Sequence, residues 1–409
     1  MRELASSLAK TVGPEILGPK LSADVRASIR EAREAGTVFP TRGGTLAVFR
    51  ATLASCIRDI EDHDRGRLLQ RFLLQGPYED VGDIPAPIAP HRLSDGETAA
   101  AIAFVYSFMV NSFKGALAEL LACRPCLRLL RTLQAEERLP ASARFFAGDA
   151  VEVPTLESSR FAKGADLHLL NIGPEGWAVG WVDLLGAVEV KSYPASQRRV
   201  REQIERHVQR GSRGLRILGT QTDGRRVRLG GQRQREPVAI VVVPGTWRLS
   251  RAIAFDDAGG REVLRIAEAE PPGSDDRVVR LSRSEWRITL RWSEEALASA
   301  AYEMTFWYMA KVGEVLYRDG VPHEWPEMSP AEAGQNAVKM MLYYAILRAR
   351  SQPEEQRAIA LYNTYGFGHA LGMSFRNQHG RREMLWPEDL YELVAKGVTR
   401  HGCRLFGSR

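Results

Sequence analysis

The stretch VGWVDLLGAVEVKSY, residues 179–193, reads as a buried strand, yet it ends with Glu189 and Lys191 two positions apart. Side chains of a strand alternate between its faces, so these two groups point the same way while Val190 points the other way. Burying both charges is costly unless a partner compensates. A metal ion with a phosphate would compensate, and so would a structural salt bridge, so a catalytic site and a plain ion pair both remain open.

The segments on either side of this strand predict an α/β fold. An apolar helix at about 95–122 precedes strand patterns that occupy residues 143–191, and a helix with an apolar stripe follows at 196–211. The run PVAIVVVPG, residues 237–245, is apolar throughout, which is typical of a strand covered on both faces. This order predicts a mixed β-sheet flanked by helices.

The length of 409 residues predicts more than one domain. We expect a helical N-terminal region at 1–92, in which the prolines of 82–92 mark a linker or long loop. The α/β core then occupies 93–250, and short strands followed by helices fill 251–409. We also expect a cytoplasmic protein without a membrane segment, because no signal peptide pattern opens the chain and its most apolar stretch, 99–110, is far shorter than the ~20 residues that span a bilayer.

Four cysteines in a chain of this length do not make a disulfide framework. Cys123 and Cys126 form the motif CRPC at the expected end of the apolar helix. No second CxxC or histidine pair nearby completes a zinc site, so we interpret them as two buried thiols.

A block of arginines follows the Glu-x-Lys strand. Residues 198–235 hold twelve arginines, no lysine and three acids, a net charge of +9 in a chain whose total is +6. Such a block is typical of contact with a polyanion, although a solvated surface or an oligomer interface gives the same pattern. Three of the arginines lie at helical spacings that make one face: Arg199, Arg206 and Arg210.

Two acids elsewhere in the core can join Glu189. Asp166 lies on the preceding strand, and a hairpin would bring both carboxylates to one sheet edge, where neighbouring strands are about 4.8 Å apart. Two such carboxylates suit Mg²⁺ or Mn²⁺, and a metal ion beside a lysine suits phosphodiester hydrolysis. Glu119 on the apolar helix is a further acid that needs a partner, with a salt bridge or a solvent-facing helix end as its plain alternatives. Asp183 competes for the role of Asp166, but it precedes Glu189 on the same strand or its entry.

This arrangement resembles the PD-(D/E)xK, or restriction-endonuclease-like, nucleases over about residues 108–245. Their core helix often carries KGxxxE, as in Lys114 through Glu119; the strand with the metal-binding aspartate is matched by GADLHL, and the (D/E)xK strand by VEVKS. Ala165 stands where the family pattern has proline. In RecB-type members a QxxxY follows on the next helix; Gln203 and His207 have that spacing, with a helix rim as the plain alternative.

The resemblance implies a metal-dependent nuclease that acts on DNA, while RNA in place of DNA stays open as an alternative. Asp166 and Glu189 would bind Mg²⁺ or Mn²⁺, Lys191 would assist the attacking water, and Glu119 would aid the metal or the water. The side chains expected to contact nucleic acid are Arg198, Arg199, Gln203, Arg206, Arg210 and Arg213.

The resemblance also implies a setting in prokaryotic restriction or phage defence, in which the helical ends recruit a second copy of the chain or a partner subunit. The alternative is a catalytically inactive subunit on the same fold that binds nucleic acid or serves as a scaffold. In a purely structural subunit, Glu189 and Lys191 would be only an ion pair.

Overall fold

A computed structural model defines the fold of the chain in several ranges. The residues described are 17–41, 43–62, 95–155, 160–172, 181–218, 226–229, 237–245, 253–256, 263–266 and 275–294, with shorter pieces at 296–298, 300–301, 304–305, 307–308, 374–376 and 382–384. The helices are α3 (Pro19–Glu34), α4 (Thr45–Asp62), α6 (Asp95–Ala135), the 3₁₀ helix η2 (Gly148–Ala150) and α7 (Gln197–Gly211). The predicted linker at 82–92 lies outside these residues.

The strands follow the same chain order. They are β1 (Ala143–Ala147), β2 (Val151–Pro154), β3 (Phe161–Lys163), β4 (Leu167–Ile172), β5 (Trp181–Val190), β6 (Leu215–Ile217), β7 (Arg226–Leu229), β8 (Val238–Gly245), β9 (Ile253–Asp256), β10 (Val263–Ile266), β11 (Arg277–Arg280), β12 (Glu285–Ser293), β13 (Ser374–Arg376) and β14 (Arg382–Met384). The pairs β9–β10 and β13–β14 each form a separate two-stranded antiparallel sheet.

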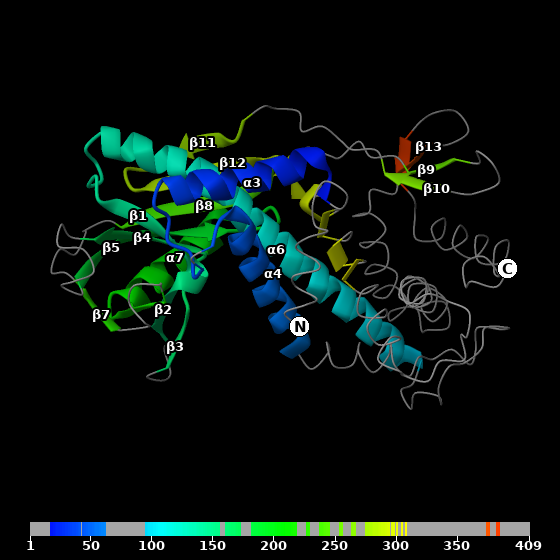
Figure 1. The fold of residues 1–409 in the computed structure, drawn as a ribbon, viewed down its shortest axis with the longest axis horizontal. Helices are drawn as coiled ribbons and strands as arrows, with labels where there is room; N and C mark the ends of the chain where they lie inside the picture. The colour runs from blue at the N-terminus through cyan, green and yellow to red at the C-terminus, as the bar shows by residue number, and fades with distance from the viewer. Residues whose placement is uncertain are drawn as a thin grey trace.

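Ten of the described strands form one mixed sheet, which confirms the predicted α/β class (Figure 1). β4 and β5 form the expected antiparallel pair, and β5, β8 and β12 run parallel to one another. β1 and β11 extend the sheet by antiparallel pairing with β4 and β12. A branch through β7, β6, β2 and β3 begins at the N-terminal end of β5.

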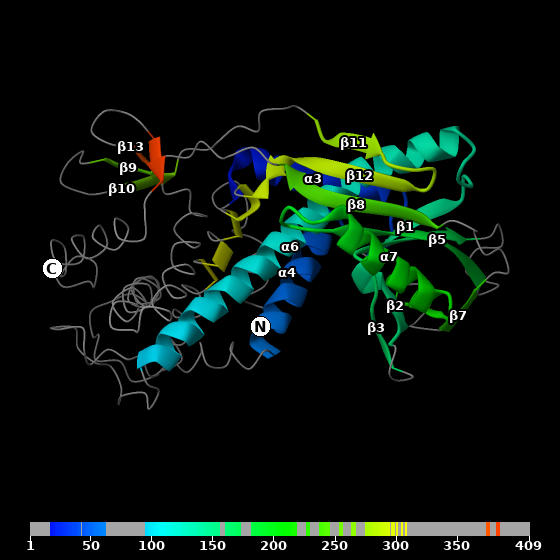
Figure 2. The same cartoon turned by 180° about the vertical axis from the view of Figure 1, so that it is seen from behind.

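Helices cover both faces of this sheet, as the two opposite views show (Figures 1 and 2). Strand β8 explains why, because it alternates between two hydrophobic clusters. Val238, Ile240 and Val242 pack into the large core that contains α3, α4 and α6. Ala239, Val241 and Val243 pack on the other face against Val200 and Ile204 of α7. The continuous apolar run at 237–245 is therefore a strand buried on both sides, as its pattern predicts.

Strands β11 and β12 belong to this sheet although they lie in the region 251–409, which the sequence pattern separates from the core. Trp286, Ile288 and Leu290 of β12 enter the same hydrophobic core as Val25 and Ile29 of α3. The parallel β8–β12 pair needs a long connection. Two strands so far apart in the sequence cannot be assigned to the same sheet from local sequence patterns.

Helix α6 continues to Ala135, beyond the end at about 122 that the CRPC motif suggests. Pro125 has no N–H to donate to the carbonyl of Leu121, so a break is the default expectation. The hydroxyl of Ser28 on α3 compensates: it donates to Leu120 O at 2.7 Å, lies 3.3 Å from Leu121 O and accepts the N–H of Arg124 at 3.0 Å. A side chain from another helix thus satisfies the backbone groups that Pro125 would leave unpaired, and α6 continues past the proline.

The two CRPC thiols, of Cys123 and Cys126, are buried and free, as expected. Burial raises the pKa of the Cys123 thiol to about 12, so that it stays protonated. No helix in the described part of the chain has the length and apolarity needed to cross a membrane.

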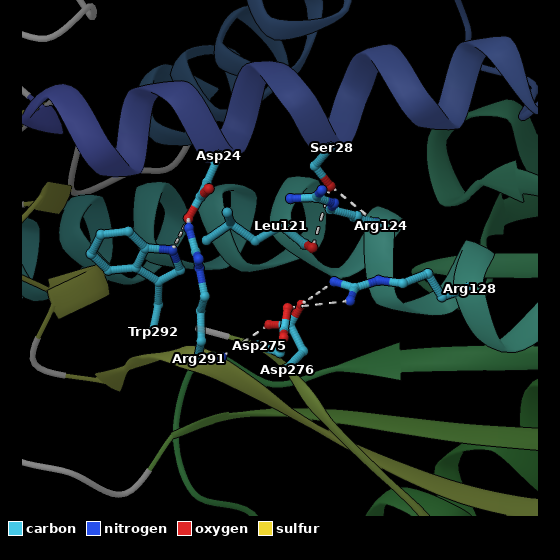
Figure 3. Close-up of a pocket in the computed structure, with 9 residues that line it drawn as sticks. All are labelled: Asp24, Ser28, Leu121, Arg124, Arg128, Asp275, Asp276, Arg291 and Trp292. Carbon is cyan, nitrogen blue, oxygen red and sulfur yellow. Dashed lines mark hydrogen bonds and ion pairs between the residues drawn. The ribbon is translucent and has the colours of Figure 1, made fainter. Parts of the chain in front are cut away.

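A polar cluster joins α3, α6 and β12 around a cavity of about 20 Å³ (Figure 3). Asp24 accepts hydrogen bonds from Trp292 Nε1 at 2.7 Å and from the guanidinium of Arg291. Asp276 accepts from Arg128 Nη2 at 3.0 Å and from the backbone N–H of Arg291 at 2.9 Å. Every carboxylate here has a cationic or N–H partner and the cavity has room for about one water, so we interpret the cluster as structural.

Candidate active site

The C-terminal end of β5 places Glu189 and Lys191 on the same side of the sheet, as strand alternation predicts. Lys191 Nζ donates to Glu189 Oε2 at 2.9 Å, and the Glu189 side chain is only 2% exposed. Val190 between them packs into the core on the opposite face. The buried carboxylate and the partly buried ammonium therefore form an ion pair at the sheet edge.

Asp166 lies next to this pair. Strand β4 begins one residue after it, at Leu167, which pairs with Val188 of β5. Continuing that antiparallel register puts Asp166 opposite Glu189. Asp166 Oδ2 accepts a hydrogen bond of 2.8 Å from the backbone N–H of Val190, which fixes the carboxylate at the end of β5. The two acids thus meet at one sheet edge, although Asp166 precedes the strand instead of lying on it.

Close backbone packing holds the turn that carries Asp166. Gly148 N donates to Asp166 O at 2.7 Å, and a Cβ at Gly148 would lie 2.5 Å from the carbonyl oxygen of Ala165, so glycine is required there. A Cβ at Gly164 would lie 2.6 Å from His168 Nε2, and this nitrogen accepts the N–H of Ala165 at 3.3 Å. His168 therefore supports the turn as a structural residue.

A second lysine and a fourth acid complete the cluster. Lys163 Nζ lies 3.5 Å from Glu119 Oε2 on α6 and 3.5 Å from Asp149 Oδ1 on η2. The same ammonium lies 4.0 Å from Asp166 Oδ1. Sequence reasoning does not find Lys163 or Asp149. The position of Lys163 three residues before Asp166 is a signal that could have found it, whereas Asp149 has no local signal.

The carboxylates of this cluster repel one another. Burial, and after it the charge of Asp166, raises the pKa of Glu189 to about 7. The same two causes raise the pKa of Glu119 to about 8. Only two ammonium groups, those of Lys163 and Lys191, form ion pairs with these acids among the described residues. Four carboxylates facing two ammonium groups leave an excess of negative charge when all are ionised.

Helix α7 adds His207 to the site. His207 Nε2 lies 3.2 Å from Glu189 Oε1, so each oxygen of Glu189 has one partner. Burial, and next the charge of Arg210, lowers the pKa of His207 to about 4, so the imidazole is neutral at pH 7. His207 Nδ1 is buried and has no hydrogen-bond partner in the described part of the chain. Gln203, one turn earlier, is half-buried on the same rim of α7.

Asp183 is kept out of the site by a β-bulge. In the β4–β5 pairing the register shifts between Leu169 and Leu170, which inserts one extra residue into β5. Asp183 and Glu189 are an even number of residues apart, so a regular strand would put them on one face, and the bulge reverses this. Asp183 Oδ2 instead accepts a hydrogen bond of 3.3 Å from Asn171 Nδ2.

The arginines of α7 differ in their exposure and in the contacts that hold their side chains. Arg206 and Arg210 are near enough to His207 to lower its pKa. Arg210 Nε also donates to Pro154 O at 2.8 Å, which holds it against β2. Arg198, 88% exposed, forms a 3.0 Å ion pair with Glu202. The other two predicted contact residues are exposed: Arg199 and Arg213.

Compared with known proteins, the chain matches no family model, no curated protein and no solved structure.

The side chains of the site can be compared with the ligands that a divalent metal ion requires. In the described ranges, no group of three or more His, Cys, Asp or Glu side chains is arranged to hold a metal ion by itself. Mg²⁺ commonly takes only one or two carboxylates and completes its shell with water and phosphate. Asp166 and Glu189 provide that number of hard oxygen donors, and the excess negative charge around them favours a cation. The residues present therefore fit Mg²⁺ or Mn²⁺.

Proposed function

We propose that this chain is a metal-dependent nuclease that hydrolyses phosphodiester bonds of DNA on a restriction-endonuclease-like core. The observation that carries the proposal is the meeting of Asp166 and Glu189 at one sheet edge, with Lys191 bonded to Glu189. The apolar helix α6, the β4–β5 pair and α7 follow in the order that the PD-(D/E)xK resemblance implies. A prokaryotic role in restriction or phage defence, as a homodimer or with a partner subunit, rests on that resemblance only. The cytoplasmic location is a separate expectation from the sequence.

The roles of the residues follow from their chemistry. A bound Mg²⁺ or Mn²⁺ would lower the pKa of a water molecule and neutralise charge on the phosphate. Asp166 and Glu189 would hold the ion, and the backbone N–H of Val190 orients the Asp166 carboxylate. Lys191 would orient the attacking water or stabilise the negative charge that develops on the phosphoryl oxygens. His207 would keep Glu189 in place from α7.

Substrate binding would use the exposed arginine face of α7. Arg199 and Arg206 are exposed, and Arg206 lies next to the His207 rim of the site. Guanidinium groups on a helix surface bind phosphates without reading the base sequence. We therefore assign to α7 a salt-dependent contact with the DNA backbone that delivers the phosphodiester to the sheet edge.

A specific observation favours the alternative of an inactive subunit. Each of the four carboxylates already lies within 4.0 Å of a lysine amine. Such internal pairing would let the cluster remain stable without any metal ion. Against this reading, four acids and two lysines are more than a structural ion pair requires, and burial and the charge of Asp166 raise the pKa values of Glu119 and Glu189, so that without a metal ion these two acids hold protons near pH 7.

A cleavage assay tests the proposal. Supercoiled plasmid and single-stranded DNA would be incubated with the full chain and Mg²⁺ or Mn²⁺, and with EDTA as the metal-free control. We expect metal-dependent cleavage that falls at least about a hundredfold in Glu189→Gln and Lys191→Ala, in line with the loss of one group that stabilises transition-state charge.

The matched control is Glu34→Gln, which removes one carboxylate from an exposed position of α3, away from the site and from α7. This variant should cleave at the wild-type rate. Circular dichroism would establish that each variant is folded. Cleavage that persists in folded Glu189→Gln, or none with any metal in the wild type, would favour the inactive subunit.

A further inference from the structure

We propose that Lys163 is an internal competitor for the divalent cation at Asp166: its ammonium neutralises the acidic cluster, and it must swing away when a metal ion binds. This inference rests on the proposed metal site but goes beyond it. It assigns a regulatory role to a lysine that the resemblance does not involve.

The position of the ammonium is that of a shared counter-ion. Its distances to Glu119 and Asp149 are both 3.5 Å, and that to Asp166 is 4.0 Å. None of these is as short as the 2.9 Å bond between Lys191 and Glu189, so the amine is shared among several acids and no single acid holds it as closely as Glu189 holds Lys191. Burial lowers the pKa of Lys163, but Glu119, Asp149 and Asp166 together raise it above its ordinary value, so the amine stays charged.

The two lysines of the site differ in their freedom to move. The Lys163 side chain is 43% exposed, whereas that of Lys191 is 16% exposed. A lysine has a flexible four-carbon stem and a strongly hydrated head, so the Lys163 amine can reach water without disturbing the core. Lys191 is the more enclosed amine, and a fixed position suits the role proposed for it.

A metal ion and the Lys163 ammonium would repel each other if both occupied the cluster. Two positive charges repel each other, more strongly near a protein surface than in water, and the charge of a divalent ion doubles the repulsion. Departure of Lys163 relieves the repulsion and leaves Asp166 Oδ1 and its acidic neighbours facing the metal. The affinity for the metal is therefore weakened by the cost of displacing Lys163.

The first experiment measures Mn²⁺ binding to the full chain by isothermal titration calorimetry and by electron paramagnetic resonance. Lys163→Met keeps the apolar stem and removes the charge, and we expect it to bind Mn²⁺ about tenfold more tightly than wild type. Lys163→Arg keeps the charge and should bind no more tightly than wild type. Lys20→Met, an equal charge loss at an exposed position of α3, should leave the affinity unchanged. Asp166→Asn should abolish binding in both backgrounds.

A second measurement uses the wild-type protein, in case Lys163→Met does not fold. Amine-reactive labelling followed by mass spectrometry would report the accessibility of each lysine with and without Mg²⁺. We expect labelling of Lys163 to rise several-fold with Mg²⁺, while that of Lys20 stays constant. Unchanged or lower labelling of Lys163 at a Mg²⁺ concentration that supports cleavage, or unchanged Mn²⁺ affinity in folded Lys163→Met, would overturn the inference and leave the nuclease proposal standing. Tighter Mn²⁺ binding by Lys163→Met than by wild type, together with no DNA cleavage by the wild-type protein, would support the inference and count against the nuclease.

Discussion

Single hydrogen bonds between distant segments determine local structure at two places, the site and helix α6. The N–H of Val190 fixes the Asp166 carboxylate beside Glu189, and the hydroxyl of Ser28 bonds the backbone of α6 next to Pro125. In both cases the donor comes from a segment distant in sequence. A residue-level account of the site therefore depends on backbone groups as much as on the acids themselves.

Ser28→Ala tests the second of these bonds. The substitution leaves Leu120 O and the N–H of Arg124 without their partner inside a buried helix contact, so we expect the free energy of unfolding to fall by about 1–3 kcal/mol. Urea unfolding followed by circular dichroism measures it. Thr132→Ala, which removes an exposed hydroxyl bonded to Arg128 O, should change stability by less than about 0.5 kcal/mol. Equal effects of the two substitutions would contradict the role given to Ser28.

Helix α7 joins the sheet to the solvent-exposed arginines. Its buried stripe of Val200 and Ile204 lies on the sheet, and His207 borders the site. Gly211 is the last residue of the helix, and a Cβ there would lie 2.7 Å from Leu184 Cδ2. Glycine thus serves close packing of α7 on β5.

The exposed face of α7 predicts a salt-dependent DNA contact. The double variant Arg199→Ala/Arg206→Ala should weaken DNA binding, and the slope of log affinity against log salt should decrease by up to about 2. Fluorescence anisotropy with a labelled duplex at several salt concentrations measures both. The matched control is Arg277→Ala/Arg280→Ala, which removes the same charge from exposed positions of β11. Equal losses in the two double variants would indicate a diffuse charge effect instead of a contact through α7.

At the scale of the whole molecule, the acidic cluster links protonation to folding. Folding raises the pKa of Glu119 to about 8 and that of Glu189 to about 7. At pH values between the ordinary pKa of a glutamate and these raised values, the folded protein therefore binds more protons than the unfolded chain. Stability that depends on such protons is lost as pH rises. His168 and His207 act oppositely, with pKa values lowered to about 3 and about 4, but their effect is largely complete above pH 6.5.

We therefore expect metal-free protein to lose stability as the pH increases from about 7 to about 8.5, by an amount on the order of 1 kcal/mol. Denaturant unfolding in EDTA at several pH values measures this. Glu119→Gln should remove most of the loss, whereas Glu34→Gln, at an exposed position of α3, should retain it. Addition of Mg²⁺ or Mn²⁺ should flatten the pH dependence of the wild type, because a bound cation replaces the protons. A wild-type stability that increases over this range would contradict the charge excess assigned to the site.

The sequence by itself determined the mixed α/β class, the strand that carries Glu189 and Lys191, and the covered strand β8, because period-two alternation and continuous apolar runs are local properties of the chain. It also indicated Asp166 as the partner acid. Only the tertiary structure brought Lys163 and Asp149 to the site, excluded Asp183 through a bulge, and let α6 pass Pro125. Those outcomes depend on ion pairs, strand register and hydrogen bonds between segments far apart in the chain. A local sequence pattern does not tell which distant segments come into contact.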